Sequence, residues 1–481
     1  MKSISRRTFV QGSLAAAAGV GWLSQSAQAA GDLEVLGKVR PRPSASIAAS
    51  PLGVGFETLD RKMFDPEPCY PYMAQLGAKW ARVQTGWNRC EPAMGKYDFA
   101  WLDGIVDRLR SIGIQPWFNL GYGNRIYTPE APNDFATGWV PLWDDAAREA
   151  WLRFVRALGE HFRDRVKHWE IWNEPNIKNF WKPHPSNPAE YVRFVELTAP
   201  VIRQAVPGAC LLGPTVWGME FYTECFERGL GKLIDKVSYH WYRPSPEDRY
   251  ESSIAACREV LARHNLNLPL WQGESGCPSQ TGGAGGMAKY DWNEERQAHW
   301  VARRTLADLR LRVEMTSYFQ TCDMLYPNED GSPGGRLNSK GLLRRSDYTP
   351  KPAYFVYQCL CALFDAESQW AELPLDLSAA DGQTLDTAAL WKAAFLRRGK
   401  PLHAYWLPAD LRQEFSRRSV DLAIPETSGT AIDVPVLIDP LNATVYRLPQ
   451  AARSQGRLRV AGVPLTDYPL LVTDRSVVEL A

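Results

Sequence analysis

Two glutamates, Glu174 and Glu274, are the residues of this sequence best placed to do chemistry, because each follows a short apolar run. Glu174 lies in the segment W-E-I-W-N-E-P-N at 169–176, and Glu274 lies in L-W-Q-G-E-S-G at 270–276. Two facing carboxylates can cleave a glycosidic bond: one protonates the leaving oxygen, and the other attacks the anomeric carbon or activates water. The pair predicts this chemistry if the fold brings the two side chains together.

Eight short apolar runs alternate with segments of helical periodicity, and this rhythm is typical of an α/β protein with a (β/α)8 TIM barrel. Segment 143–163, for example, repeats apolar residues at helical spacing. A doubly wound sheet is the structural alternative, but no G-x-G-x-x-G follows the first run. The runs lie at 52–56, 80–84, 114–119, 166–172, 210–214, 237–241, 268–273 and 315–320.

The barrel expectation places both glutamates at one site. Catalytic side chains of such barrels lie at the C-terminal ends of the strands. Glu174 follows the fourth run and Glu274 the seventh, so both are expected to face one cleft from opposite sides of the barrel mouth.

Changes in residue pattern divide the chain into four parts. Residues 1–29 read as a signal peptide, 30–50 as an N-terminal strand and linker, 51–365 as the barrel, and 366–481 as an all-β module, expected to be a sandwich. Segment 349–364 is expected to be the closing helix of the barrel, and the strand at 31–37 to pair with the β-module.

The N-terminus predicts export. Arg6 and Arg7, followed by Thr8 and Phe9, resemble a twin-arginine signal, and the apolar stretch 14–23 and A-Q-A at 27–29 complete the pattern. We therefore expect a periplasmic or secreted protein with no membrane anchor after cleavage. Nine cysteines without metal-ligand spacing predict free thiols rather than a disulfide framework.

Composition limits the classes of partner. The 481 residues carry 55 basic and 54 acidic side chains, so no positive excess favours nucleic acid. The 19 Trp and 19 Tyr suit sugar binding, although a Trp-rich core would account for many of them. Metal-binding and phosphate-binding motifs are absent, and we expect no cofactor and no metal. The expected partner is a carbohydrate.

The segment W-E-I-W-N-E-P-N-I-K-N-F-W at 169–181 resembles the acid/base segment of clan A glycoside hydrolases, most of all family 39. Segments 80–88, 236–242, 270–276 and 351–358 resemble the same family. That family includes β-xylosidases, α-L-iduronidase and exopolysaccharide hydrolases. The resemblance covers about 50–365.

The resemblance implies roles for the residues at the strand ends. Glu174 would be the general acid/base and Glu274 the nucleophile, while Asn173 would bind the sugar 2-hydroxyl. Arg82 would hold Glu274 ionised, Tyr242 would donate to it, and His240 would flank the site. Candidates for the sugar-binding rim are Trp87, Asn88, Asn119, Trp181, Trp217, Trp241 and Trp292.

The sequence departs from the family pattern after the eighth run. Many clan members place a Trp there as a sugar platform, whereas this chain has Phe319 and Gln320 near that position. The wall of the subsite that binds the reacting sugar is therefore expected to differ.

The clan mechanism is retaining, so the carboxyl groups of Glu174 and Glu274 are expected to lie about 5–5.5 Å apart. Glu174 is expected to have a raised pKa, so that it is protonated when the substrate arrives. Three alternatives remain: a non-hydrolytic glycan-binding protein of the same fold, a transglycosylase, and a redox enzyme suggested by the export signal alone.

Overall fold

The computed structural model describes residues 33–216, 218–328, 330–332, 334–380, 385–416, 418–426, 429–448 and 451–481. The predicted signal peptide at 1–29 and the rim candidate Trp217 lie outside these described residues. Within them, none of the helices combines the length and the apolar character needed to span a bilayer.

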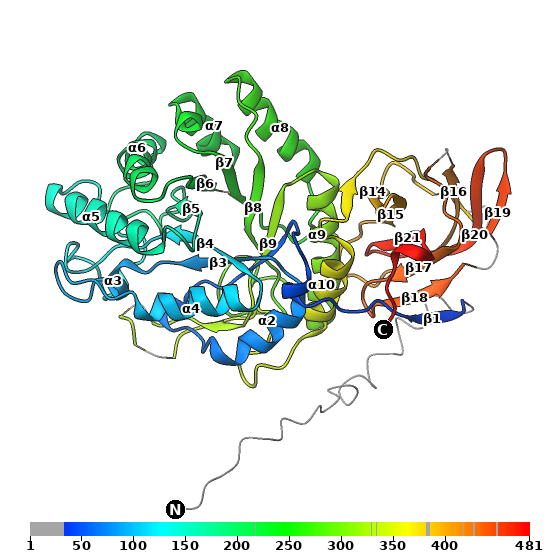
Figure 1. The fold of residues 1–481 in the computed structure, drawn as a ribbon, viewed down its shortest axis with the longest axis horizontal. Helices are drawn as coiled ribbons and strands as arrows, with labels where there is room; N and C mark the ends of the chain where they lie inside the picture. The colour runs from blue at the N-terminus through cyan, green and yellow to red at the C-terminus, as the bar shows by residue number, and fades with distance from the viewer. Residues whose placement is uncertain are drawn as a thin grey trace, which may run out of the picture.

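Eight parallel strands close into a barrel in chain order, from β2 round to β9 (Figure 1). Each falls on one of the eight apolar runs, and the (β/α)8 prediction is confirmed. Nearly all of their residues are buried, as expected for parallel strands covered by helices. The strands are β2 (Leu52–Gly55), β3 (Trp80–Gln84), β4 (Gln115–Leu120), β5 (His168–Ile171), β6 (Cys210–Val216), β7 (Lys236–His240), β8 (Leu270–Ser275) and β9 (Met315–Tyr318).

Helices follow the strands and form the outer layer of the barrel (Figure 1). The helices are α2 (Tyr70–Leu76), α3 (Trp87–Cys90), α4 (Ala100–Ser111), α5 (Asp145–Phe162), α6 (Pro188–Ala205), α7 (Met219–Glu227), α8 (Tyr250–Arg263), α9 (Glu294–Arg310) and α10 (Pro352–Leu363). Side-chain caps stabilise the starts of α5, α6 and α9: at α5, Asp144 accepts a hydrogen bond from the backbone N–H of Ala147 at 2.8 Å.

The C-terminal part forms two antiparallel sheets, so the prediction of an all-β sandwich is confirmed. One has the order β1-β18-β17-β21-β15-β14-β12 and the other β13-β16-β20-β19. Their strands are β12 (Ser368–Trp370), β13 (Asp376–Ala379), β14 (Trp391–Arg397), β15 (Lys400–Trp406), β16 (Arg418–Pro425), β17 (Pro435–Asp439), β18 (Thr444–Arg447), β19 (Ala451–Ser454), β20 (Arg457–Leu465) and β21 (Leu470–Asp474).

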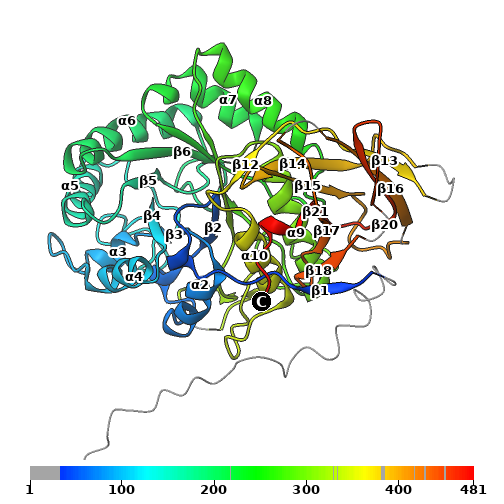
Figure 2. The same cartoon turned by 45° about the vertical axis from the view of Figure 1, so that its right-hand side comes forward.

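The N-terminal strand β1 (Val35–Lys38) pairs with β18, with Val35 opposite Tyr446 (Figure 2). This pairing confirms the expectation that the first strand joins the C-terminal module. The described part of the chain therefore passes from the sandwich into the barrel.

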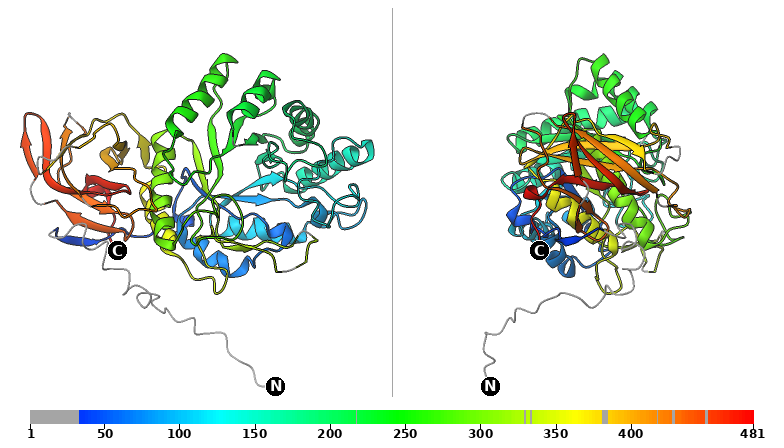
Figure 3. Two further views of the ribbon diagram at one scale, coloured as in Figure 1. Left: turned by 180° about the vertical axis from the view of Figure 1, so that it is seen from behind. Right: turned by 90° about the vertical axis from the view of Figure 1, so that its right-hand side faces the viewer.

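The sandwich packs on the side of the barrel that carries α9 and α10, as the views from behind and from the side show (Figure 3). Buried polar contacts hold the two parts together. Glu247, in the loop after β7, accepts hydrogen bonds from Arg303 of α9 at 2.6 Å and from the indole of Trp406 of β15 at 2.7 Å. The loop after β7 is thus fixed from both parts of the protein.

The segment 320–350 contains a short hairpin. Strand β10 (Met324–Leu325) pairs with β11 (Leu337–Asn338), and Leu343 bridges to Cys322. This segment follows β9 and therefore starts at the same end of the barrel as Glu174 and Glu274.

Candidate active site

The segment that carries Glu174 leaves β5 in an unusual backbone conformation. Trp172 and Glu174 have φ angles of 67° and 44°, in the left-handed region that non-glycine residues seldom adopt. The carbonyl of Trp172 accepts hydrogen bonds from Asn119 at 2.7 Å and from Thr215 at 3.3 Å, which fixes this turn. Such a conformation persists only where neighbouring contacts hold it, and it directs the side chains of this segment.

The structure brings Glu174 and Glu274 together at the C-terminal end of the barrel. An oxygen of each lies within 4.8 Å of the other and of a ring nitrogen of His240. Both side chains keep a small exposed fraction, 11% for Glu174 and 13% for Glu274. This close approach of two oxygens is compatible with the roughly 5–5.5 Å between the carboxyl groups of retaining enzymes.

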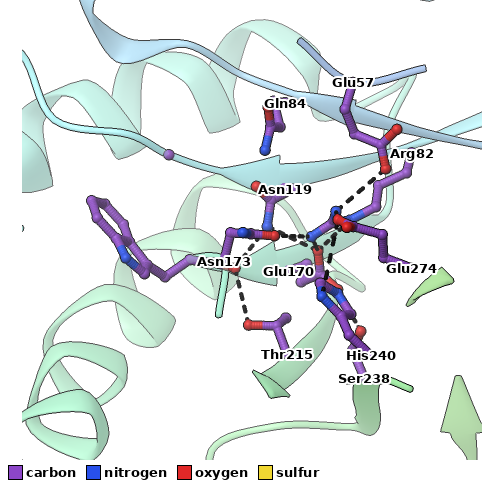
Figure 4. Close-up of polar contacts among 12 residues, drawn as sticks. Glu57, Arg82, Gln84, Asn119, Glu170, Asn173, Thr215, Ser238, His240 and Glu274 are labelled. Carbon is purple, nitrogen blue, oxygen red and sulfur yellow. Dashed lines mark hydrogen bonds and ion pairs between the residues drawn. The ribbon is translucent and has the colours of Figure 1, made fainter. Parts of the chain in front are cut away.

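Arg82 of β3 connects several residues of this site through its guanidinium (Figure 4). Its Nη1 donates to Glu274 at 2.7 Å, its Nε donates to Glu170 of β5 at 2.7 Å, and its Nη2 donates to Asn173 at 2.8 Å. Arg82 is fully buried, so this cation stabilises the ionised form of Glu274 with little screening by solvent. Because Arg82 donates to the Oδ1 of Asn173, the amide N–H₂ of Asn173 is the group available to donate to a ligand.

Tyr242 holds the other oxygen of Glu274. Its hydroxyl donates to Oε1 at 2.8 Å, while Arg82 occupies Oε2. Burial raises the pKa of Tyr242 well above its usual value, with the neighbouring Glu274 charge as the next cause, so the hydroxyl keeps its proton at neutral pH. Glu274 thus accepts two strong hydrogen bonds, which suits a nucleophile that must be ionised.

Glu174 has the opposite environment. Burial raises its pKa to about 7, although Arg82 acts in the opposite direction. His240 lies beside it, with Nδ1 3.0 Å from a carboxyl oxygen of Glu174. Burial lowers the pKa of His240 to about 4, so the ring is neutral at pH 7 and the contact is a hydrogen bond rather than an ion pair. Two carboxyl groups with different environments are the arrangement expected of an acid and a nucleophile.

The cluster of Glu174, His240 and Glu274 is also the one group of described residues whose ligand atoms lie close enough together for a metal ion. The guanidinium of Arg82 lies 2.7 Å from Glu274, and its positive charge opposes a cation there. The donors around Glu274 therefore suit a free carboxylate better than a metal ligand.

The aromatic candidates for a sugar-binding rim lie in the protein core, which corrects the expectation for Trp87 and Trp181. Both are fully buried. Trp87 stacks against Tyr127 at 5.2 Å, and its indole N–H donates to Glu91 at 2.6 Å. Trp181 packs edge-on against Trp172, with ring centroids 6.4 Å apart. Their polar edges and flat faces serve the packing of helices on the barrel.

Other candidates are also largely covered. Trp241 and Trp292 are 8% and 3% exposed, and Asn88 is half-buried on α3. Asn119 is buried and donates to Glu170 at 2.8 Å, so it supports the site instead of facing a substrate rim. After β9, Phe319 and Gln320 are 6% and 1% exposed.

Three buried charged residues belong to the site but were not singled out from the sequence. Glu170 accepts hydrogen bonds from Arg82, Asn119 and Ser238. Glu57 follows β2 and accepts from Arg82 at 3.3 Å. Lys340 lies over the ring of Tyr242, with Nζ 5.8 Å from the centroid, and burial lowers its pKa to about 8. A glutamate inside the fourth apolar run and another directly after the first run were the signals for Glu170 and Glu57.

Comparison with known proteins supports the resemblance seen in the motifs. The model of glycosyl hydrolases family 39 matches residues 85–269. A β-xylosidase of Geobacillus stearothermophilus is 30% identical over 166 residues, which are 30% of this chain and 31% of that protein. A β-xylosidase of Caldicellulosiruptor saccharolyticus is 25% identical over 214 residues, which are 39% of this chain and 41% of that protein. The chain thus spans less than half the length of these curated relatives.

Solved structures share the fold over most of the chain. A family 39 glycoside hydrolase from the gut symbiont Bacteroides cellulosilyticus WH2 matches with a TM-score of 0.63 and 19% identity, covering 91% of this chain and 81% of that one. The family 39 enzyme of Xanthomonas axonopodis pv. citri matches with a TM-score of 0.55 and 18% identity, covering 92% and 96%. The resemblance to clan A glycoside hydrolases, most of all family 39, is confirmed.

Proposed function

We propose that this chain, which is most similar to family 39 of clan A, is an exported retaining β-glycosidase that cleaves oligo- or polysaccharides. The observation that carries the proposal is the pair of glutamates at the ends of β5 and β8, with carboxyl oxygens within 4.8 Å. Export rests on the twin-arginine pattern at residues 3–9.

In the first step Glu274 attacks the anomeric carbon and the glycosidic bond to the leaving oxygen breaks. Glu174 gives its proton to that oxygen, so that a neutral alcohol departs and a glycosyl ester on Glu274 remains. The raised pKa of Glu174 supports this role, because a useful fraction of its carboxyl group is protonated near pH 7.

In the second step Glu174, now ionised, takes a proton from water, and the water oxygen attacks the anomeric carbon. The ester bond to Glu274 breaks and its carboxylate becomes negatively charged again. Hydrogen bonds from Arg82 and Tyr242 stabilise that charge. The amide of Asn173 is positioned beside Arg82 to donate to the sugar 2-hydroxyl.

The test is hydrolysis of a panel of aryl β-glycosides, beginning with the β-xyloside because the curated relatives are β-xylosidases. Wild type and Glu274→Ala are compared, with Glu259→Ala on the exposed face of α8 as the control. We expect turnover by wild type and by the control, and none by Glu274→Ala. Absence of wild-type activity on the aryl glycosides and on polysaccharides would contradict the proposal.

A further inference from the structure

Glu57 is a buried carboxyl group that the two-step mechanism does not use. It lies directly after β2, with 1% of its surface exposed, and it points toward Arg82 beside Glu274 (Figure 4). Its Oε1 accepts from the same nitrogen of Arg82, Nη1, that donates to Glu274, at 3.3 Å against 2.7 Å.

Gly55 makes room for this carboxyl group. A Cβ at residue 55 would lie 2.2 Å from Oε2 of Glu57, so the side chain folds back over the end of β2. Within the described residues, Oε2 is buried and has no hydrogen-bond partner. The arrangement therefore leaves one oxygen of a buried carboxyl group without a hydrogen-bond partner.

Three carboxyl groups share one guanidinium. Glu57, Glu170 and Glu274 all contact Arg82, and with all three ionised Arg82 would leave two negative charges uncompensated. Lys340, which interacts with Glu274, offsets only one of them. Burying unpaired charge is costly, so one of the three must hold a proton.

Hydrogen bonding identifies the group that holds it. Glu170 accepts from Arg82, Asn119 and Ser238, and Glu274 accepts from Arg82 and Tyr242. Among side-chain donors Glu57 has only Arg82, at 3.3 Å. The ionised form is favoured where donors converge, so the proton belongs on Glu57.

The charges that act on Glu57 support this assignment. Burial raises its pKa to about 8, Arg82 on β3 lowers it, and the charge of Glu274 on β8 raises it further. The Glu274 contribution exists only while that carboxylate is ionised. In the glycosyl ester it is gone, and Arg82 has lost one of its two ionised partners.

We propose that Glu57 is a positioning residue that holds a proton while Glu274 is ionised and loses it to solvent when Glu274 becomes glycosylated. Arg82 then faces two ionised carboxylates in both states: Glu170 and Glu274 in the free enzyme, and Glu170 and Glu57 in the intermediate. Hydrolysis of the ester returns the charge to Glu274 and a proton from solvent to Glu57. The inference rests on the proposed retaining mechanism.

The first test counts protons when the intermediate is trapped. A 2,4-dinitrophenyl 2-deoxy-2-fluoro-β-xyloside, with the corresponding glucoside as a second probe, is added to Glu174→Gln. The Glu174→Gln change removes the acid/base as a proton source. The dinitrophenolate leaves as a weakly basic anion that consumes no proton. An indicator dye measures the protons that the enzyme releases.

We expect Glu174→Gln to release up to about one proton more per trapped site near pH 7 than Glu57→Gln/Glu174→Gln does, because Lys340, which also loses the neighbouring Glu274 charge, contributes equally to both variants. Equal release by the two variants, or no release by Glu174→Gln after labelling, overturns the role of Glu57. Failure of both probes to label wild type contradicts the proposed function instead.

The second test needs no variant at position 57 to fold. Infrared spectra of Glu174→Gln before and after trapping should show the loss of one carboxylic acid C=O band and the gain of the ester band. Buried acids remote from the site, such as Asp439 of the sandwich, cancel in the difference. A difference spectrum with no lost acid band would refute the proposal.

Discussion

Tyr242→Phe is the sharpest test of how Glu274 is held for attack on the anomeric carbon. The change deletes one oxygen, and with it the 2.8 Å hydrogen bond to Oε1 of Glu274. The ring remains, so its packing under Lys340 is retained. Arg82 still donates to Oε2.

The expected magnitude follows from the type of bond. A hydrogen bond to a charged, largely buried acceptor contributes about 1.5–3 kcal/mol. If the bond holds the carboxylate in the geometry from which it attacks, its loss lowers kcat/KM by about 10- to 150-fold.

The assay is kcat/KM for an aryl β-glycoside with a good leaving group, because that substrate depends little on Glu174. Tyr222→Phe is the matched control: its hydroxyl donates to the carbonyl of Cys257 at 3.3 Å, away from the site. The control should keep the wild-type kcat/KM. If Tyr242→Phe keeps it as well, the hydrogen bond does not hold Glu274 for attack.

Further predictions concern the acid and the core. Glu174→Ala should lose much more activity on substrates with poor leaving groups than on those with good ones, and azide should restore it; equal losses would contradict the acid assignment. For a poor leaving group, wild-type kcat/KM should fall as pH rises through about 7, because the protonated form of Glu174 is then lost; a flat alkaline profile would argue against its raised pKa. Trp87→Ala should lower the free energy of unfolding by about 3–5 kcal/mol, as measured by urea denaturation, because the ring of Trp87 is part of the core. A loss of substrate affinity with unchanged stability would instead show that Trp87 contacts the sugar. Trp406→Phe should lower the free energy of unfolding by about 1–3 kcal/mol, because Glu247 loses a buried donor; Trp391→Phe on the paired strand is the control.

The barrel was predictable from the sequence because each parallel strand is covered on both faces and reads as an apolar run. The runs 80–84 and 210–214 fall on β3 and β6, the latter continuing to Val216. The residue that follows a run then lies at the C-terminal end of a strand. That reasoning located Glu174 and Glu274, and applied to the first run it would have located Glu57.

The aromatic rim was not predictable, because residue type does not determine which face of a helix layer a tryptophan occupies. Trp87 begins α3 and packs against α5 through Trp151 and Phe154, an arrangement that depends on long-range packing. The charges beneath the site were missed for a different reason. The role of a glutamate in an apolar run, such as Glu170, becomes clear only when the fold shows which cation on another strand it pairs with. For Glu170 that cation is Arg82 of β3.

The proposed mechanism requires that Glu274 forms a covalent bond to the sugar. This bond is observed by mass spectrometry of wild type after reaction with 2,4-dinitrophenyl 2-deoxy-2-fluoro-β-glycosides, followed by peptide mapping. We expect one added fluoroglycosyl group, located on Glu274, and none on Glu274→Ala. A label on Glu174 or on another residue, or an unlabelled protein that nevertheless hydrolyses aryl β-glycosides, would contradict it.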